Sequence, residues 1–176
     1  MIKYLRSKVF FRLVNFLLNK KKEKHRFFSA FHNLVVNFFS CLPTTKLSQL
    51  FFLTGTDKYT NYKFLYDNVL QGLISKKKVR RILELGIGGH SRDINSGKSL
   101  IAFSKFYKNA FVYGLDLADK KFLDSGKIKT LICDQGDKRS LIKLAKKNGP
   151  FDLIIDDGSH FTNHQKISFN SLFKYL

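Results

Sequence analysis

Two carboxylates and an imidazole lie within five residues in the segment Asp156-Asp157-Gly158-Ser159-His160. Carboxylate oxygens are good ligands for a hard cation, and histidine is the side chain best suited to accept a proton near neutral pH. The apolar run of residues 151–155 precedes this segment and predicts a buried strand. We therefore expect a loop that combines a metal ligand with a general base. The alternative is a plain Asp-Gly turn with a solvent-exposed histidine.

A glycine cluster, Gly86, Gly88 and Gly89, follows the apolar run of residues 81–85. Glycine allows a tight turn and a close approach of the backbone to a ligand. A dinucleotide-binding enzyme is one interpretation, but its motif requires a third glycine where Ser91 stands. The cluster alone is therefore a weak signal.

Acidic residues end two further apolar runs. Asp116 follows residues 111–115, and Asp134 follows residues 128–133. A carboxylate at the end of the second strand is placed to accept hydrogen bonds from a ribose diol. Capping of the next turn or helix is the alternative role.

Two other patterns do not indicate sites. Gly97-Lys98-Ser99 resembles the end of a phosphate-binding P-loop, but Arg92 stands where that motif requires its first glycine. Nucleoside triphosphate binding is therefore not expected. His160 and His164 have helical spacing but lack the HExxH pattern, so we do not expect zinc between them.

Helices must separate the four strands. The apolar patterns of residues 99–107 and 140–147 predict two of these helices. Alternating strands and helices predict an α/β fold, a Rossmann-like parallel sheet with flanking helices. Ligands bind such sheets beyond the carboxyl ends of the strands, which is where the acidic residues and glycines occur.

Charge is concentrated at the N-terminus. The 176 residues include 32 Lys and Arg and 13 Asp and Glu, a net charge of +19, and residues 1–30 carry +8 of it. Such a charge favours an anionic partner or is simply solvated. No aromatic-basic signature of nucleic-acid binding accompanies it, so nucleic acid is not an expected partner.

Residues 1–50 are expected to form a basic amphipathic leader before a domain of residues 51–176. Apolar residues repeat at helical spacing over residues 2–16 and again over residues 27–42. The second stretch is shorter than the roughly 20 residues of a membrane span. The helices are expected to cover the domain or a second subunit, or to contact a membrane peripherally. Residues 44–56 are interpreted as a linker with one apolar patch.

Cysteine usage indicates a reducing compartment. Cys41 and Cys133 are far apart in the chain and form no CxxC pair, so we expect no disulfide framework and a cytoplasmic location. A secretory signal is disfavoured because Arg12 interrupts the first apolar run.

The motifs LELGIGG (83–89), YGLD (113–116), CDQGD (133–137) and FDLIIDDGSH (151–160) together resemble class I S-adenosylmethionine-dependent methyltransferases. They are similar in particular to the metal-dependent sugar O-methyltransferases of the mycinamicin and macrocin type. The segment GTDK (55–58), followed by two tyrosines, resembles the segment that precedes the cofactor domain there. The resemblance covers residues 55–176 and implies magnesium-assisted methylation of a hydroxyl on a sugar or glycoside.

Carried over residue by residue, the resemblance implies three kinds of site. His160 would be the general base, and Asp157 would bind Mg²⁺. The residues implied in cofactor binding are Thr56, Lys58, Glu84, Gly86, Gly88, Gly89, Asp116, Asp134 and Gln135. The S-adenosylmethionine ribose would lie against Asp116, with Asp134 and Gln135 beside the adenine.

The chain departs from the family pattern because it stops at Leu176, before the later strands and a further acidic metal ligand. The expected sheet is therefore incomplete on its C-terminal side, with an open edge that favours a partner or a homo-oligomer. Two alternatives remain open. One is an inactive or truncated methyltransferase-like protein whose basic leader binds membrane. The other is a hydroxylase-like or polysaccharide-modifying relative with the same fold.

Overall fold

The computed structural model describes residues 25–70, 74–89, 93 and 95–176. Contacts within the chain form two units, residues 1–35 and 36–176. Helix α2 (His25–Cys41) confirms the helix predicted over residues 27–42, and Pro43 follows its end. The helix expected over residues 2–16 lies outside the described residues. Within the part of the chain that is described, no helix has the length and apolar character that a membrane span needs.

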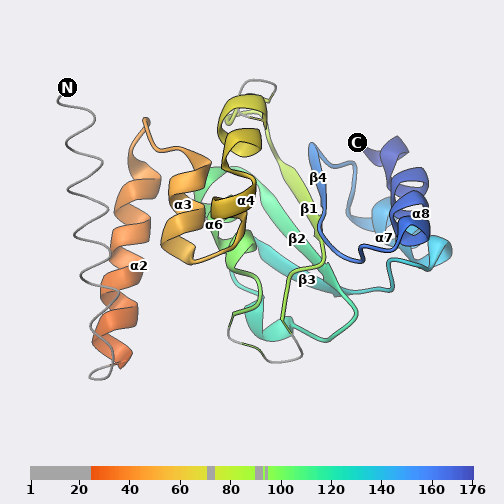
Figure 1. The fold of residues 1–176 in the computed structure, drawn as a ribbon, viewed down its shortest axis with the longest axis horizontal. Helices are drawn as coiled ribbons and strands as arrows, with labels where there is room; N and C mark the ends of the chain where they lie inside the picture. The colour runs from red at the N-terminus through yellow and green to blue at the C-terminus, as the bar shows by residue number, and fades with distance from the viewer. Residues whose placement is uncertain (1–24, 71–73, 90–92, 94) are drawn as a thin grey trace. The chain divides into compact units, whose positions relative to one another are not determined.

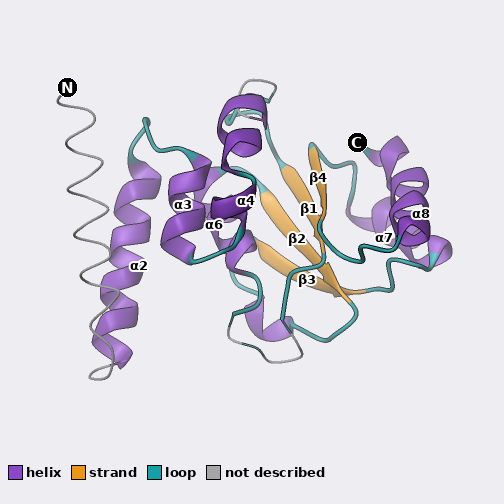
Figure 2. Cartoon of the chain, viewed as in Figure 1, coloured by secondary structure: helices purple, strands orange, loops and turns teal. Residues whose placement is uncertain are grey.

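A parallel four-stranded sheet forms the centre of the second unit (Figures 1 and 2). Its strands are β1 (Arg81–Leu85), β2 (Phe111–Asp116), β3 (Ile128–Ile132) and β4 (Leu153–Asp156), in the order β3-β2-β1-β4. Leu85 lies opposite Leu115 on β2 and opposite Asp156 on β4. The α/β fold predicted from the sequence is confirmed, and the carboxyl ends of β1, β2 and β4 meet at one edge.

Helices cover both faces of this sheet (Figure 2). Helix α6 (Lys98–Phe106) packs on β2, while α7 (Lys138–Asn148) and α8 (Thr162–Leu172) pack against each other. On the α7–α8 face, Leu83 and Leu85 join a buried cluster with Leu141 and Leu172. Ile82 and Glu84 alternate with them and are fully buried as well. Both faces of β1 are therefore closed to water, as expected for a central parallel strand.

The linker predicted over residues 44–56 is wrong, because α3 (Leu47–Thr54) forms there. Leu50 and Phe51 of this helix are fully buried. The Phe51 ring makes an edge contact with Phe103 of α6, with centroids 5.4 Å apart. The division at residue 50 into leader and domain stays a prediction, but α3 itself packs on α6 within the second unit.

Four short helices complete the described fold. Helix α4 (Lys58–Asn61) follows α3 closely, and a π-helix spans Leu65–Leu70. One-turn 3₁₀ helices cover Lys121–Leu123 and Phe173–Tyr175. Gly55 ends α3 with a φ of +73° and turns the chain into α4, which brings Lys58 to the sheet.

Candidate functional site

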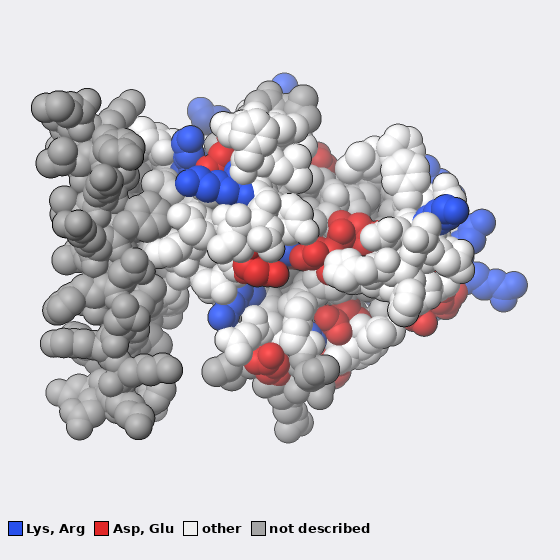
Figure 3. All heavy atoms as spheres, viewed as in Figure 1, with Lys and Arg blue, Asp and Glu red and all other residues white. Residues whose placement is uncertain are grey.

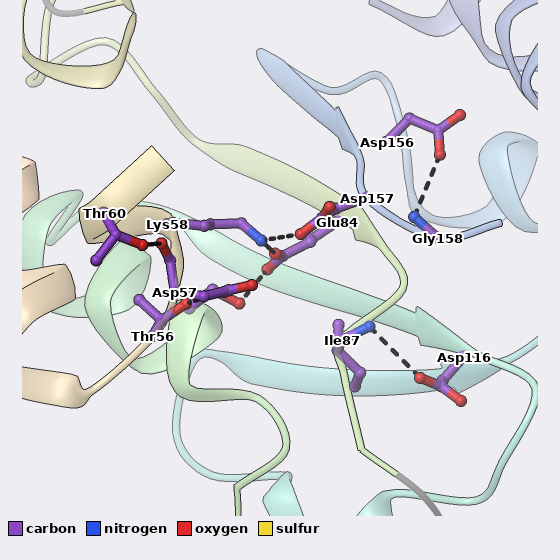
Figure 4. Close-up of polar contacts among 11 residues, drawn as sticks. Thr56, Asp57, Lys58, Thr60, Glu84, Ile87, Asp116, Asp156, Asp157 and Gly158 are labelled. Atoms are coloured by element: carbon purple, nitrogen blue, oxygen red, sulfur yellow. Dashed lines mark hydrogen bonds and ion pairs between the residues drawn. The ribbon is translucent and has the colours of Figure 1, made fainter. Parts of the chain in front are cut away.

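Glu84 anchors the site at the end of β1 (Figure 4). Its side chain is fully buried, and Ser99 at the start of α6 donates a 2.8 Å hydrogen bond to Oε2. The Lys58 ammonium lies 2.9 Å from Oε1. A buried carboxylate requires such partners, because burying a charge without them is costly.

Lys58 joins Glu84 to Asp157, which follows β4. Its ammonium contacts Oδ2 of Asp157 as well as Glu84, and the residue is only 4% exposed. Burial lowers the pKa of Lys58, but the carboxylates of Glu84 and Asp157 outweigh burial and hold that pKa above its ordinary value. Lys58 is therefore a permanent cation that connects α4 with two strand ends.

The glycine turn after β1 closes tightly on the loop after β4. Gly86 has a φ of +74°, and its N–H donates a 2.8 Å hydrogen bond to the Leu115 carbonyl. A Cβ added to Gly86 would stand 2.3 Å from Cα of Gly158. Gly88 also has a positive φ, but no atom lies within 4 Å of the position that an added Cβ would take. Gly86 is thus required for backbone packing, while Gly88 leaves room at the site.

Asp116 ends β2 and faces this turn (Figure 4). Its Oδ1 accepts a 3.0 Å hydrogen bond from the Ala118 N–H, and its Oδ2 accepts a 3.4 Å bond from the Ile87 N–H. The Lys120 ammonium lies 3.2 Å from Oδ2. The carboxylate is therefore held by neighbours on both of its oxygens.

Asp134 and Gln135 follow β3 but differ in environment. Asp134 is exposed, and its Oδ1 accepts a 2.7 Å hydrogen bond from the Gly136 N–H. Gln135 is buried; its amide donates to Asp156 at 2.8 Å and accepts from the Ser159 N–H at 2.7 Å. Gln135 therefore braces the loop that carries Asp157 and His160.

Two cavities open along this edge of the sheet. One, of about 430 Å³, is lined by Asp116, Asp134 and Gln135. The other, of about 370 Å³, is lined by Thr56, Lys58 and His160. The residues that border both cavities are Gly86, Gly88 and Asp157. Acidic side chains gather near the middle of this face (Figure 3).

The structure thus brings most of the predicted site residues to one edge. His160 is exposed on the smaller cavity, beside Thr56 and Lys58. Gly89 lines neither cavity, but its carbonyl accepts a 2.9 Å hydrogen bond from Lys120. Among the described residues, no group of three His, Cys, Asp or Glu side chains is arranged to hold a metal ion.

Sequence reasoning missed Lys120, Ser99 and the buried Ser168, which donates to Asp156. A lysine that follows a strand normally indicates a solvated surface. The spacing of Asp116 and Lys120, four residues apart, was the one signal that could have indicated their pairing. Nothing in the sequence predicts the serine contacts.

The relatives that sequence comparison found are O-methyltransferases. No family model matches the chain. Demethylmacrocin O-methyltransferase of Streptomyces fradiae is 42% identical over 96 residues, which are 54% of this chain and 24% of that protein. Mycinamicin VI 2''-O-methyltransferase of Micromonospora griseorubida is 41% identical over 96 residues, with the same coverage of 54% and 24%. The chain therefore spans about a quarter of the length of the curated relatives it matches.

Solved structures agree with the sequence relatives. The MycE methyltransferase, determined in complex with Mg, SAH and mycinamycin VI, superposes with a TM-score of 0.70 and 33% identity over 78% of this chain and 37% of that chain. A second MycE structure, with Mg and SAH, gives a TM-score of 0.68 and 33% identity over 74% of this chain and 34% of that chain. By sequence and by fold, this chain is therefore a homologue of part of the sugar O-methyltransferases of the macrocin and mycinamicin type.

Proposed function

We propose that this chain supplies the cofactor-binding part of an S-adenosylmethionine-dependent O-methyltransferase that acts on a hydroxyl of a sugar or glycoside. One observation carries the proposal. The cavity at the ends of β1, β2 and β4 is bordered by Gly86, Asp116, Asp134 and Asp157. Acidic lining suits a sulfonium cation, and a strand-end glycine turn suits a ligand that approaches the backbone. The names of the relatives point to the same reaction.

In this proposal, different residues contact different parts of the cofactor. Gly86 and Gly88 border its methionine part, Glu84 acts from beneath through Lys58, and Asp116 accepts from its ribose. Asp134 and Gln135 lie beside the adenine, with Gln135 acting mainly by bracing the loop after β4. Thr56 and Lys58 close the methionine side, since both line the smaller cavity.

His160 would remove the proton of the acceptor hydroxyl. The sulfonium already activates the methyl group, so the protein has to align the hydroxyl and take its proton. His160 is exposed on the smaller cavity, where its imidazole is accessible to an acceptor. Its loop is held by Gln135 through Asp156 and Ser159.

Mg²⁺ would use Asp157 as one oxygen ligand. Lys58 contacts Oδ2, and Oδ1 is left for a cation. A hard cation needs about six oxygens, so substrate, water and residues outside the described part would supply the others. When bound, the ion would lower the pKa of a sugar hydroxyl and orient it.

Transfer of a labelled methyl group from S-adenosylmethionine to a panel of glycosides, in the presence of Mg²⁺, tests this function. His160→Ala should abolish transfer, while calorimetry still detects S-adenosylhomocysteine binding. His32→Ala is a matched control, because His32 lies on α2, and it should transfer normally. Normal transfer by His160→Ala would exclude the histidine as base. A polysaccharide-modifying relative would instead methylate only polymeric acceptors.

A further inference from the structure

Lys120 is a fully buried lysine beneath the glycine turn. Its side chain has 0% exposure, although it follows β2 in a loop. The ammonium donates to the carbonyls of Gly88 and Gly89, the latter at 2.9 Å, and to Ser96 Oγ at 3.2 Å. It also lies 3.2 Å from Oδ2 of Asp116. A single cation thus joins the turn after β1 to the carboxylate at the end of β2.

These contacts orient the backbone of the turn. The carbonyl and N–H of a trans peptide point in opposite directions. Because the Gly88 carbonyl points at Lys120, the N–H of Gly89 points away from the lysine. Gly88 has a positive φ and lines both cavities. Lys120 therefore favours one orientation of this glycine segment, whose residues have an intrinsically wide choice of backbone angles.

The same ammonium orients Asp116. A carboxylate has about four acceptor positions. Lys120 and the Ile87 N–H occupy Oδ2, and the Ala118 N–H takes one position on Oδ1. One position on Oδ1 remains, and Asp116 lines the larger cavity.

We propose that Lys120 is a positioning residue that presents Asp116 and the glycine turn to the ribose of the bound nucleoside. The inference rests on the proposed function, because it assigns a ribose to Asp116. Lys120 itself does not touch the ligand. A purely structural lysine would stabilise the fold without affecting how well the protein distinguishes a ribose from a deoxyribose.

The test compares the affinities of the whole chain for S-adenosylhomocysteine and for its 2′,3′-dideoxy analogue, measured by calorimetry. The dissociation constant of the analogue divided by that of S-adenosylhomocysteine measures how much the ribose hydroxyls contribute to binding. In Lys120→Met this ratio should fall by about tenfold, the usual value of a hydrogen bond to a charged group. Lys127→Met is the control: Lys127 also donates to a backbone carbonyl, that of Lys108, but at an exposed position. Its ratio should equal that of the wild type.

Two further variants make the result decisive. In an Asp116→Asn background, Lys120→Met should leave the ratio unchanged, because the lysine acts through the carboxylate. Lys120→Gln keeps donors for the glycine carbonyls but lacks the charge; it should lower the ratio even if Lys120→Met does not fold. An unchanged ratio in a folded Lys120 variant would overturn the inference. Failure of the wild type to bind S-adenosylhomocysteine would instead overturn the proposed function.

Discussion

The ammonium of Lys58 lies 2.9 Å from Oε1 of Glu84, so a residue of the short helix α4 neutralises the buried carboxylate of the central strand. The same ammonium contacts Asp157 after β4. The segment that precedes the sheet is therefore part of the site and holds its acidic residues at their spacing.

Removal of the Lys58 charge should destabilise the fold. Lys58→Met leaves Glu84 fully buried without a counter-charge, and breaking a buried pair typically costs about 3–5 kcal/mol. Urea denaturation measures this loss. Lys63→Met, at an exposed lysine of the same segment, is the control and should unfold like the wild type. The double variant Lys58→Met with Glu84→Gln should recover part of the loss.

The pH dependence of the Lys58 contribution has a definite sign. The pKa of Lys58 is raised in the folded protein. The stability that its ion pairs contribute is therefore fully present below the unfolded-state pKa of about 10.4, and it is lost as pH rises through the folded-state pKa. The difference in unfolding free energy between wild type and Lys58→Met should therefore be smaller above the folded-state pKa of Lys58 than at neutral pH. A difference that already falls between neutral pH and about pH 9 would contradict the ion pair.

A methyl group at Gly86 should disrupt the site. Gly86→Ala combines a φ of +74° with a Cβ 2.3 Å from Gly158, so it should destabilise the protein and weaken S-adenosylhomocysteine binding. Gly126→Ala is matched, because its φ is +51° and nothing lies within 4 Å of the added Cβ. It should cost only about 1–2 kcal/mol of backbone strain and leave binding intact. Equal effects of the two variants would argue against the close approach at Gly86.

The Cys133 thiol should react slowly at neutral pH. Burial, with help from Asp137 and Asp134, raises the pKa of Cys133 to about 11. In a Cys41→Ser variant, the rate of iodoacetamide labelling should therefore rise with pH toward about 11, and not level off near the 9.0 of a free thiol. Because Cys133 lines the larger cavity, S-adenosylhomocysteine should slow the labelling. Labelling that is fast at neutral pH and indifferent to the ligand would contradict this placement.

Substitution of Asp157 tests the proposed metal. Asp157→Asn keeps the shape but removes a charged oxygen ligand, so transfer should require a much higher Mg²⁺ concentration. Asp152→Asn is the control; that carboxylate accepts from the backbone of Arg80 and Arg81 at the opposite end of β4. Its Mg²⁺ requirement should match the wild type. Transfer that is indifferent to a chelator would exclude a metal role for Asp157.

The sequence predicted the sheet and the edge where the site lies, because apolar runs followed by Gly86, Asp116 and Asp156 indicate parallel strands whose carboxyl ends meet at one edge. It did not predict α3, whose apolar patch around Leu50 is too short to distinguish a helix from a linker. Lys58 entered only through the family resemblance. Lys120 was missed because its burial depends on partners from a different loop, Gly88 and Ser96, and no local pattern encodes that contact.

The most direct test of the central claim is a calorimetric titration of the whole chain with S-adenosylhomocysteine and, separately, with NAD. The account predicts saturable binding of S-adenosylhomocysteine that is weakened in Asp116→Asn and in Gly86→Ala but kept in Gly126→Ala, with no binding of NAD. Binding of NAD without S-adenosylhomocysteine, or S-adenosylhomocysteine binding that is indifferent to Asp116 and Gly86, would contradict it.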